Sequence, residues 1–167
     1  MIIFICILIV TIFLAYANGA NDNFKGVATL FGSGASDYKK ALWWATITTF
    51  LGSIAALFVA SNLVTAFSGK GLVPDAISGN PHFLVAVGLG AACTVFIASL
   101  TGIPISTTHS LIGALVGVGI IAVGTNINLH ILGGKFFAPL LFSPLMAALL
   151  TLAIYPSFKW IKDETWH

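Results

Sequence analysis

Residues 17–23, with the sequence ANGANDN, interrupt a long apolar stretch and decide how the chain must be folded. The sixteen residues before position 17 contain hardly any polar side chain, whereas positions 18–23 hold three carboxamides and one carboxylate. The chain then becomes mostly apolar again up to Gly32. Such a polar stretch is either the loop that ends a membrane span or the reason that the helix stops there.

The composition of the whole chain indicates that lipid is its main solvent. Of its 167 residues, 58% are hydrophobic and 7% are charged, and the mean hydropathy is +1.03. A soluble domain carries roughly a quarter charged residues. The net charge is only +2, there is no arginine, and the lysines form no patch. The sequence therefore predicts contact with membrane lipid and excludes a nucleic-acid-binding protein, which needs clustered cations against phosphates.

The apolar segments are long enough to span a membrane, because a spanning helix needs about 20 residues. The predicted spans are residues 2–17, continuing after a break to 33, and residues 41–64, 82–100, 107–123 and 136–155. Together they form a single transmembrane domain, residues 1–158, followed by a short tail, residues 159–167. The sequence thus predicts an all-α, multi-pass integral membrane protein.

Lysine placement predicts the orientation in the cell membrane. Lys39 and Lys40 lie in the first connection, and Lys159 and Lys162 lie in the tail. The connections that would lie on the opposite side of the membrane carry one lysine each. Cytoplasmic loops are enriched in Lys and Arg. The first connection and the tail are therefore expected to face the cytoplasm.

A second polar break occurs at residues 101–110, TGIPISTTHS, and has the same form as the first. Because Asn, Asp, Ser and Thr are preferred helix N-caps, new helices are expected near Asp22 or Asn23, and near Ser106 or Thr107. A helix N-terminus presents unpaired N–H groups and a positive dipole end, which bind anions. At membrane depth such a break is tolerated only inside protein or beside a cavity. Discontinuous or re-entrant helices of this kind form the substrate sites of secondary transporters.

Three ionisable side chains are candidates for function at these breaks. Asp22 is the strongest, because a carboxylate at membrane depth by default marks an ion or proton path. Lys25 follows one turn later and could pair with Asp22, reach an anion or extend to the membrane interface. His109 could relay a proton near neutral pH, or serve as a neutral structural residue.

Other chemistries do not fit these residues. Ser106, His109 and Asp22 are the residue types of a hydrolase triad, but no nucleophile elbow frames the serine. A catalytic metal needs about three His, Cys or carboxylate ligands, and no Gly-rich nucleotide loop occurs. The sequence predicts a protein that is not an enzyme and has no cofactor, and no metal site beyond a possible sodium ion at Asn21 and Asp22.

The two breaks resemble the motifs of a known family. GANDN at residues 19–23 is similar to the Gly-Ala-Asn-Asp signature of the inorganic phosphate transporter (PiT) family, and residues 104–109 are similar to its Pro-x-Ser-x-Thr-His segment. The similarity extends over essentially the whole chain and resembles the N-terminal repeat of that family. It implies cation-coupled symport of inorganic phosphate, driven by sodium or protons, through two inverted repeats with the site between them.

Charge suggests how the residues divide between the two ions. Phosphate would be repelled by Asp22 unless a cation lay between them, so Asn21 and Asp22 are the predicted ligands of the coupling cation. Phosphate oxygens are assigned to the hydroxyls and N–H groups of the second break and to one amide of the first. The predicted phosphate ligands are Ser106, Thr107, Thr108 and Asn23, and Lys25 and His109 are accessory candidates.

The chain departs from the family pattern in two ways. Many members continue the first motif as Gly-Ala-Asn-Asp-x-x-Asn, and Lys25 occupies that last position here, which leaves the coupling ion open. One copy of each motif also amounts to a single repeat. A partner is therefore expected, either a C-terminal half or a second copy. The alternatives are a sulfate permease of the same family and an inactive half-length membrane subunit.

Overall fold

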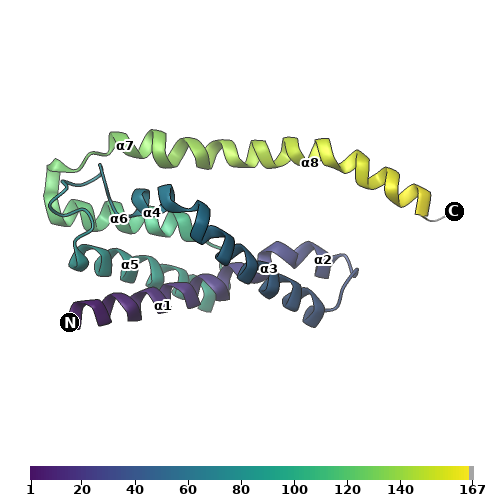
Figure 1. Cartoon of the computed structure of the whole chain (residues 1–167), viewed down its shortest axis with the longest axis horizontal. Coiled ribbons are helices and arrows are strands. Elements are labelled where there is room, and N and C mark those ends of the chain that lie inside the picture. Colours follow the sequence, from purple (N-terminus) through teal and green to yellow (C-terminus); the bar gives the residue numbers. More distant parts are fainter. Residues whose placement is uncertain (166–167) are drawn as a thin grey trace. The chain divides into compact units, whose positions relative to one another are not determined.

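The computed structural model describes residues 1–165, with the side chains of all but residues 62, 63, 66, 135, 157 and 159–165 (Figure 1). The side chains of the predicted tail, residues 159–167, therefore lie outside the described residues. The chain divides into two units, Met1–Asn128 and the part from Leu129 onward.

The first unit holds most of the helices and all of the predicted site residues. Its elements are α1 (Ile2–Asp22), the 3-10 helix η1 (Asn23–Val27), α2 (Ala28–Gly32), α3 (Tyr38–Val59), α4 (Ser61–Phe67), α5 (Pro81–Leu100), α6 (Thr107–Val123) and the 3-10 turn η2 (Gly124–Asn126). The second unit consists of α7 (His130–Leu132), the π-helical segment η3 (Gly133–Phe137) and α8 (Ala138–Thr165).

Among residues 1–165, five helical segments are long and apolar enough to cross a membrane. They are Ile2–Gly32, Tyr38–Val59, Pro81–Leu100, Thr107–Asn126 and Ala138–Pro156. No named β-strand occurs among residues 1–165. The prediction of an all-α, multi-pass integral membrane protein is confirmed.

The first polar stretch changes the type of helix at the expected place but does not leave a non-helical gap. α1 continues through it to Asp22, and Asn23 keeps helical angles, with φ −58° and ψ −44°. The helix only tightens into η1, and no side chain caps the start of η1 or of α2. A new helix therefore begins at Asn23 as expected, with Asp22 at its N-cap position. The side-chain cap is absent, because the side chains of Asp22 and Asn23 bind Lys25 and other helices instead of their own backbone.

The second break is a true interruption, as predicted. α5 ends at Leu100, and Gly102 has a φ of +71°, a conformation that glycine adopts without steric cost. The chain then runs without helix until Ser106, which has extended angles and accepts a hydrogen bond from the backbone N–H of His109 at 3.4 Å. Ser106 is therefore the N-cap of α6, one of the two positions expected.

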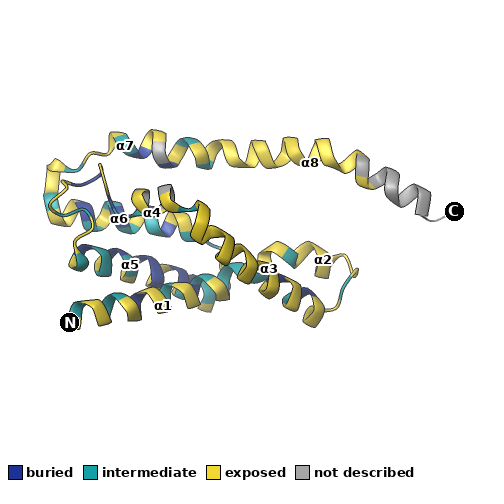
Figure 2. Cartoon of the chain, viewed as in Figure 1, coloured by how far each residue is buried: buried dark blue, intermediate teal, exposed yellow. Residues whose placement is uncertain are grey.

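The core of the first unit lies where α1 packs against α5 and α5 packs against α6 (Figures 1 and 2). Its fully buried residues are small or branched, among them Ala17, Ala91, Val95 and Leu115. Small side chains let membrane helices approach closely, which strengthens van der Waals packing where lipid offers no hydrophobic driving force. The α1–α5 contact thus holds the first break beside the second.

Gly88 gives a test of this packing. A Cβ added at Gly88 on α5 would lie 2.6 Å from Cγ1 of Val10 on α1. Valine has few rotamers with which to retreat, so we expect Gly88→Ala to lower the free energy of unfolding by about 1–3 kcal/mol. Thermal unfolding in detergent measures the change. Gly52→Ala on α3 is the control, because a Cβ there meets nothing within 4 Å; equal stability of both variants would contradict the packing.

Candidate functional site

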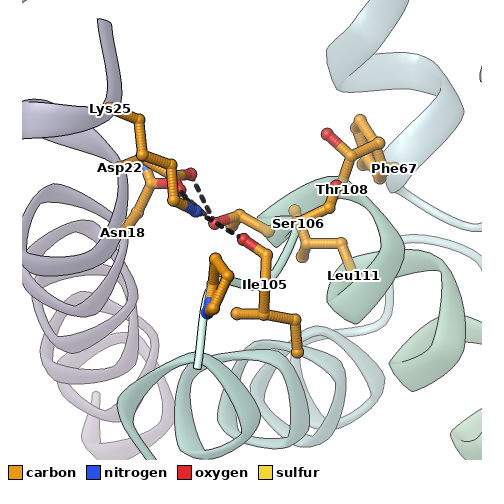
Figure 3. Close-up of a pocket in the computed structure, with 10 residues that line it drawn as sticks. Asn18, Asp22, Lys25, Phe67, Ile105, Ser106, Thr108 and Leu111 are labelled. Atoms are coloured by element: carbon orange, nitrogen blue, oxygen red, sulfur yellow. Dashed lines mark hydrogen bonds and ion pairs between the residues drawn. The ribbon is translucent and has the colours of Figure 1, made fainter. Parts of the chain in front are cut away.

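A pocket of about 580 Å³ lies between the first polar stretch and the start of α6 (Figure 3). Three of its lining residues come from α1 and η1, and most of the others come from the second break. The lining residues are Asn18, Asp22, Lys25, Phe67, Pro104, Ile105, Ser106, Thr107, Thr108 and Leu111. The two stretches singled out in the sequence, some eighty residues apart, therefore meet at one pocket, which we call the Asp22 pocket.

Lys25 joins the two breaks to each other. Its Nζ donates to Oδ1 of Asn21 at 2.6 Å, to Oδ1 of Asp22 at 2.5 Å and to the backbone carbonyl oxygen of Ile105 at 2.8 Å. An ammonium group has three donors, so all of them are used within the chain. Of the alternatives open from the sequence, the structure has Lys25 paired with Asp22.

The second oxygen of Asp22 is also engaged. Oγ1 of Thr107 lies 3.0 Å from Oδ2 of Asp22 and 2.7 Å from Oδ1 of Asn18. The single hydroxyl proton can be donated to either acceptor. Thr107 stands in the first turn of α6, so this contact fixes the N-terminus of α6 against α1.

Asn21 is oriented by a residue of α5. Its Nδ2 donates to Oγ of Ser99 at 3.0 Å, and Ser99 in turn donates to the carbonyl oxygen of Val95 at 2.8 Å. Because the amide nitrogen is held in this way, the amide oxygen of Asn21 is directed at Lys25. The carboxamide, the carboxylate and the carbonyl of Ile105 form a three-oxygen site around the ammonium.

Sequence reasoning missed Asn18, Ser99 and the carbonyl of Ile105. The position of Asn18 could have been predicted, because Asn18 precedes Asp22 by four residues and residues so spaced share one helix face. The role of Ser99 could not have been predicted from the sequence, since it depends on how α1 packs on α5.

Two predicted residues lie away from the Asp22 pocket. The side chain of Asn23 donates to Thr46 at 3.2 Å and accepts from Thr49 at 2.9 Å, both on α3. His109 lines a separate pocket of about 390 Å³ with Thr94 and Ser110. The structure therefore brings together Asn21, Asp22, Lys25 and the Ser106–Thr108 hydroxyls, and it leaves Asn23 and His109 outside that cluster.

The charges of the Asp22 pocket cancel within the described residues. Asp22 and Lys25 are its only charged lining residues, and they pair with each other. The remaining polar groups are amides, hydroxyls and the N-terminus of α6, where unpaired N–H groups carry partial positive charge. Such a pocket suits an anion together with a compensating cation.

A polar pocket at an interrupted helix among apolar helices is a feature that secondary transporters share. The sequence profile of the Phosphate transporter family matches residues 18–166. The chain belongs to this family.

The relatives agree with this membership. The chain is 33% identical over 159 residues to a "putative phosphate permease" of Pyrococcus abyssi. The aligned residues make up 91% of this chain and 38% of the relative. It is 29% identical over 152 residues to the inorganic phosphate transporter 2-1, chloroplastic, of Arabidopsis thaliana, with 88% and 25% covered. It is 32% identical over 112 residues to the sodium-dependent phosphate transporter of Plasmodium falciparum, with 65% and 16% covered.

The chain thus spans less than two fifths of the length of each of these curated relatives. No solved structure matches it closely enough to be compared.

Proposed function

We propose that the chain is one repeat of a cation-coupled symporter of inorganic phosphate. The observation that carries the proposal is the meeting of both family motifs at the Asp22 pocket, which combines a carboxylate, hydroxyls and a helix N-terminus. Helix N-termini bind phosphate groups readily. Cation-coupled transporters place substrate and ion together at interrupted helices.

The exposure of the site supports a second repeat as partner. Within this chain the side chains of Lys25 and Asp22 are 42% and 35% exposed, and Ser106 and Thr108 are exposed as well. Charged and unpaired polar groups at membrane depth are costly against lipid. A second repeat, in a C-terminal half or a second copy inserted the opposite way, would cover them and complete the pocket.

In this proposal the two ions take different parts of the site. The hydroxyls of Ser106 and Thr108, with the first N–H groups of α6, bind phosphate oxygens, whereas the hydroxyl of Thr107 stays bonded to Asn18 and Asp22. The oxygens of Asn21 and Asp22 bind the coupling cation, sodium or a proton. The cation makes anion binding favourable, and the anion makes cation binding favourable to the same extent. Rocking of one repeat against the other then exposes the site to alternate sides.

The two outlying residues take other roles in the proposal. Both ends of the Asn23 amide are bonded to α3, so we assign Asn23 to holding η1 against α3 and not to phosphate. His109 lies in its own pocket, so it is placed outside the ion path of this repeat.

Reconstitution tests the proposal. The chain is inserted into vesicles together with its second repeat, and uptake of labelled phosphate is measured under an imposed sodium or proton gradient. We expect uptake that one of the two gradients drives and that unlabelled phosphate inhibits more strongly than sulfate does. Stronger inhibition by sulfate would identify a sulfate permease, and absence of uptake with the second repeat present would refute the transport function.

A further inference from the structure

We propose that the ammonium of Lys25 is an internal cation that competes with the coupling cation for the three-oxygen site. The inference rests on the proposed function and deepens it, because it says what fills the cation position of this repeat before a free ion arrives. It also gives a role to the residue at which the chain departs from the Gly-Ala-Asn-Asp-x-x-Asn pattern.

The ligands around Lys25 are those of a hard cation. A carboxylate oxygen, a carboxamide oxygen and a backbone carbonyl oxygen lie 2.5–2.8 Å from Nζ. Carboxylate and carbonyl oxygens are the donors that hard metal ions select in proteins. A sodium ion bound to Asn21 and Asp22 would need the same two side-chain oxygens, so ion and ammonium exclude each other.

The competition is strong because Lys25 is tethered. It lies in η1, three residues beyond Asp22, so its effective concentration at the site is set by a short stretch of chain and does not fall on dilution. A free ion binds only in the fraction of molecules in which Lys25 has left. The apparent affinity of the free ion is its intrinsic affinity multiplied by that fraction.

Lys25 also has space into which it can withdraw. Besides the Asp22 pocket, it lines a pocket of about 400 Å³ with Ser99, Gly102 and Pro104, and its side chain is 42% exposed in the chain. Lys25 therefore lines two cavities, and its side chain is not enclosed by the protein. Displacement needs a rotamer change of one long side chain.

The test replaces Lys25 by neutral residues and measures sodium dependence. If the site is filled by Lys25 in roughly nine molecules of ten, Lys25→Met lowers the sodium concentration for half-maximal uptake of labelled phosphate about tenfold. Lys25→Gln, which keeps a donor for Asp22, is expected to shift in the same direction. Lys25→Arg keeps the charge and is expected to retain the sodium dependence of the unchanged protein.

Lys40→Met is the matched control. Lys40 forms an ion pair with Asp37 at 3.2 Å and the same three-residue spacing, but at the exposed start of α3, away from the Asp22 pocket. The backbone N–H and the ammonium of Lys40 lower the pKa of Asp37, which favours the ionised form of this carboxyl group. Loss of its lysine is expected to leave sodium dependence unchanged.

A second measurement needs no transport. Sodium stabilises a protein only if it binds the folded state, so addition of sodium is expected to raise the Tm of purified Lys25→Met and Lys25→Gln more than that of the unchanged protein. Unchanged half-saturation and unchanged Tm shifts in both neutral variants would overturn the inference. Failure of the proposed function is distinguishable, because it would appear as absence of phosphate uptake by the unchanged protein while the Tm shifts still report on competition.

Discussion

Asp22→Asn is expected to reduce cation-driven phosphate uptake by about 100-fold or more, while the protein still folds. Asp22 is the only anionic side chain among the described residues that line the Asp22 pocket. Asparagine keeps its shape and an acceptor for Lys25 or Thr107, but it cannot neutralise a bound cation. Losing about 3 kcal/mol of a charge interaction at membrane depth corresponds to about two powers of ten in rate.

The structural effect of removing Asp22 must be separated from the effect on transport. Asp22→Ala removes both acceptors and leaves the Lys25 ammonium without its carboxylate, so we expect poor folding. The double variant Asp22→Asn with Lys25→Met removes both charges, and it is expected to restore thermal stability but not uptake. Asp37→Asn, at the exposed start of α3, is the control that should transport normally. Cation-dependent uptake by Asp22→Asn at the unchanged rate would refute the role of Asp22.

The parts of the structure that follow local rules could be predicted from the sequence. The apolar stretches correspond to five helices of the described residues that are long and apolar enough to cross a membrane, because length and hydropathy are properties of the sequence alone. Ser106 caps α6 as expected, since an N-cap bonds to the backbone three residues ahead. The cost of leaving either polar break in lipid requires that each lie inside protein or beside a cavity, but it does not by itself predict that the two breaks meet.

The first polar stretch lacks the expected side-chain caps because its side chains form hydrogen bonds with residues that are distant in the sequence. Asn21 bonds to Ser99, 78 residues away, and Asn23 bonds to Thr46 and Thr49 of α3. Cap preferences describe how a side chain competes for its own backbone. They do not apply once tertiary contacts satisfy the side chain, so the backbone of α1 remained helical through Asp22.

The exclusion of His109 from the Asp22 pocket is a matter of helical geometry. His109 follows Thr107 by two residues, which places it about 200° further around α6. Leu111 follows Thr107 by four residues and lines the same pocket as Thr107, whereas Gly113 follows His109 by four and lines the other pocket. Once the start of α6 is known, this separation can be read from the sequence.

The adjacent residues Thr107 and Thr108 are expected to respond differently to the same substitution. Thr107→Val removes the hydroxyl that lies near both Asn18 and Asp22. The two acceptors then lose the single donor that they share, and we expect the free energy of unfolding to fall by about 1–3 kcal/mol. Since this contact also fixes α6 against α1, uptake of labelled phosphate should fall about tenfold or more at every phosphate concentration.

Thr108 lines the same pocket. Within the described part of the chain, however, its hydroxyl makes no hydrogen bond like those of Thr107. Thr108→Val should therefore leave thermal unfolding unchanged. A hydrogen bond to a charged group contributes about 1.5–3 kcal/mol, so the phosphate concentration for half-maximal uptake should rise about tenfold or more, with the maximal rate nearly kept. The two roles are separable because the hydroxyl of Thr107 is used by the protein, whereas that of Thr108 is the one that we propose binds the anion. Equal losses of stability in both variants, or unchanged half-saturation in Thr108→Val, would contradict this division.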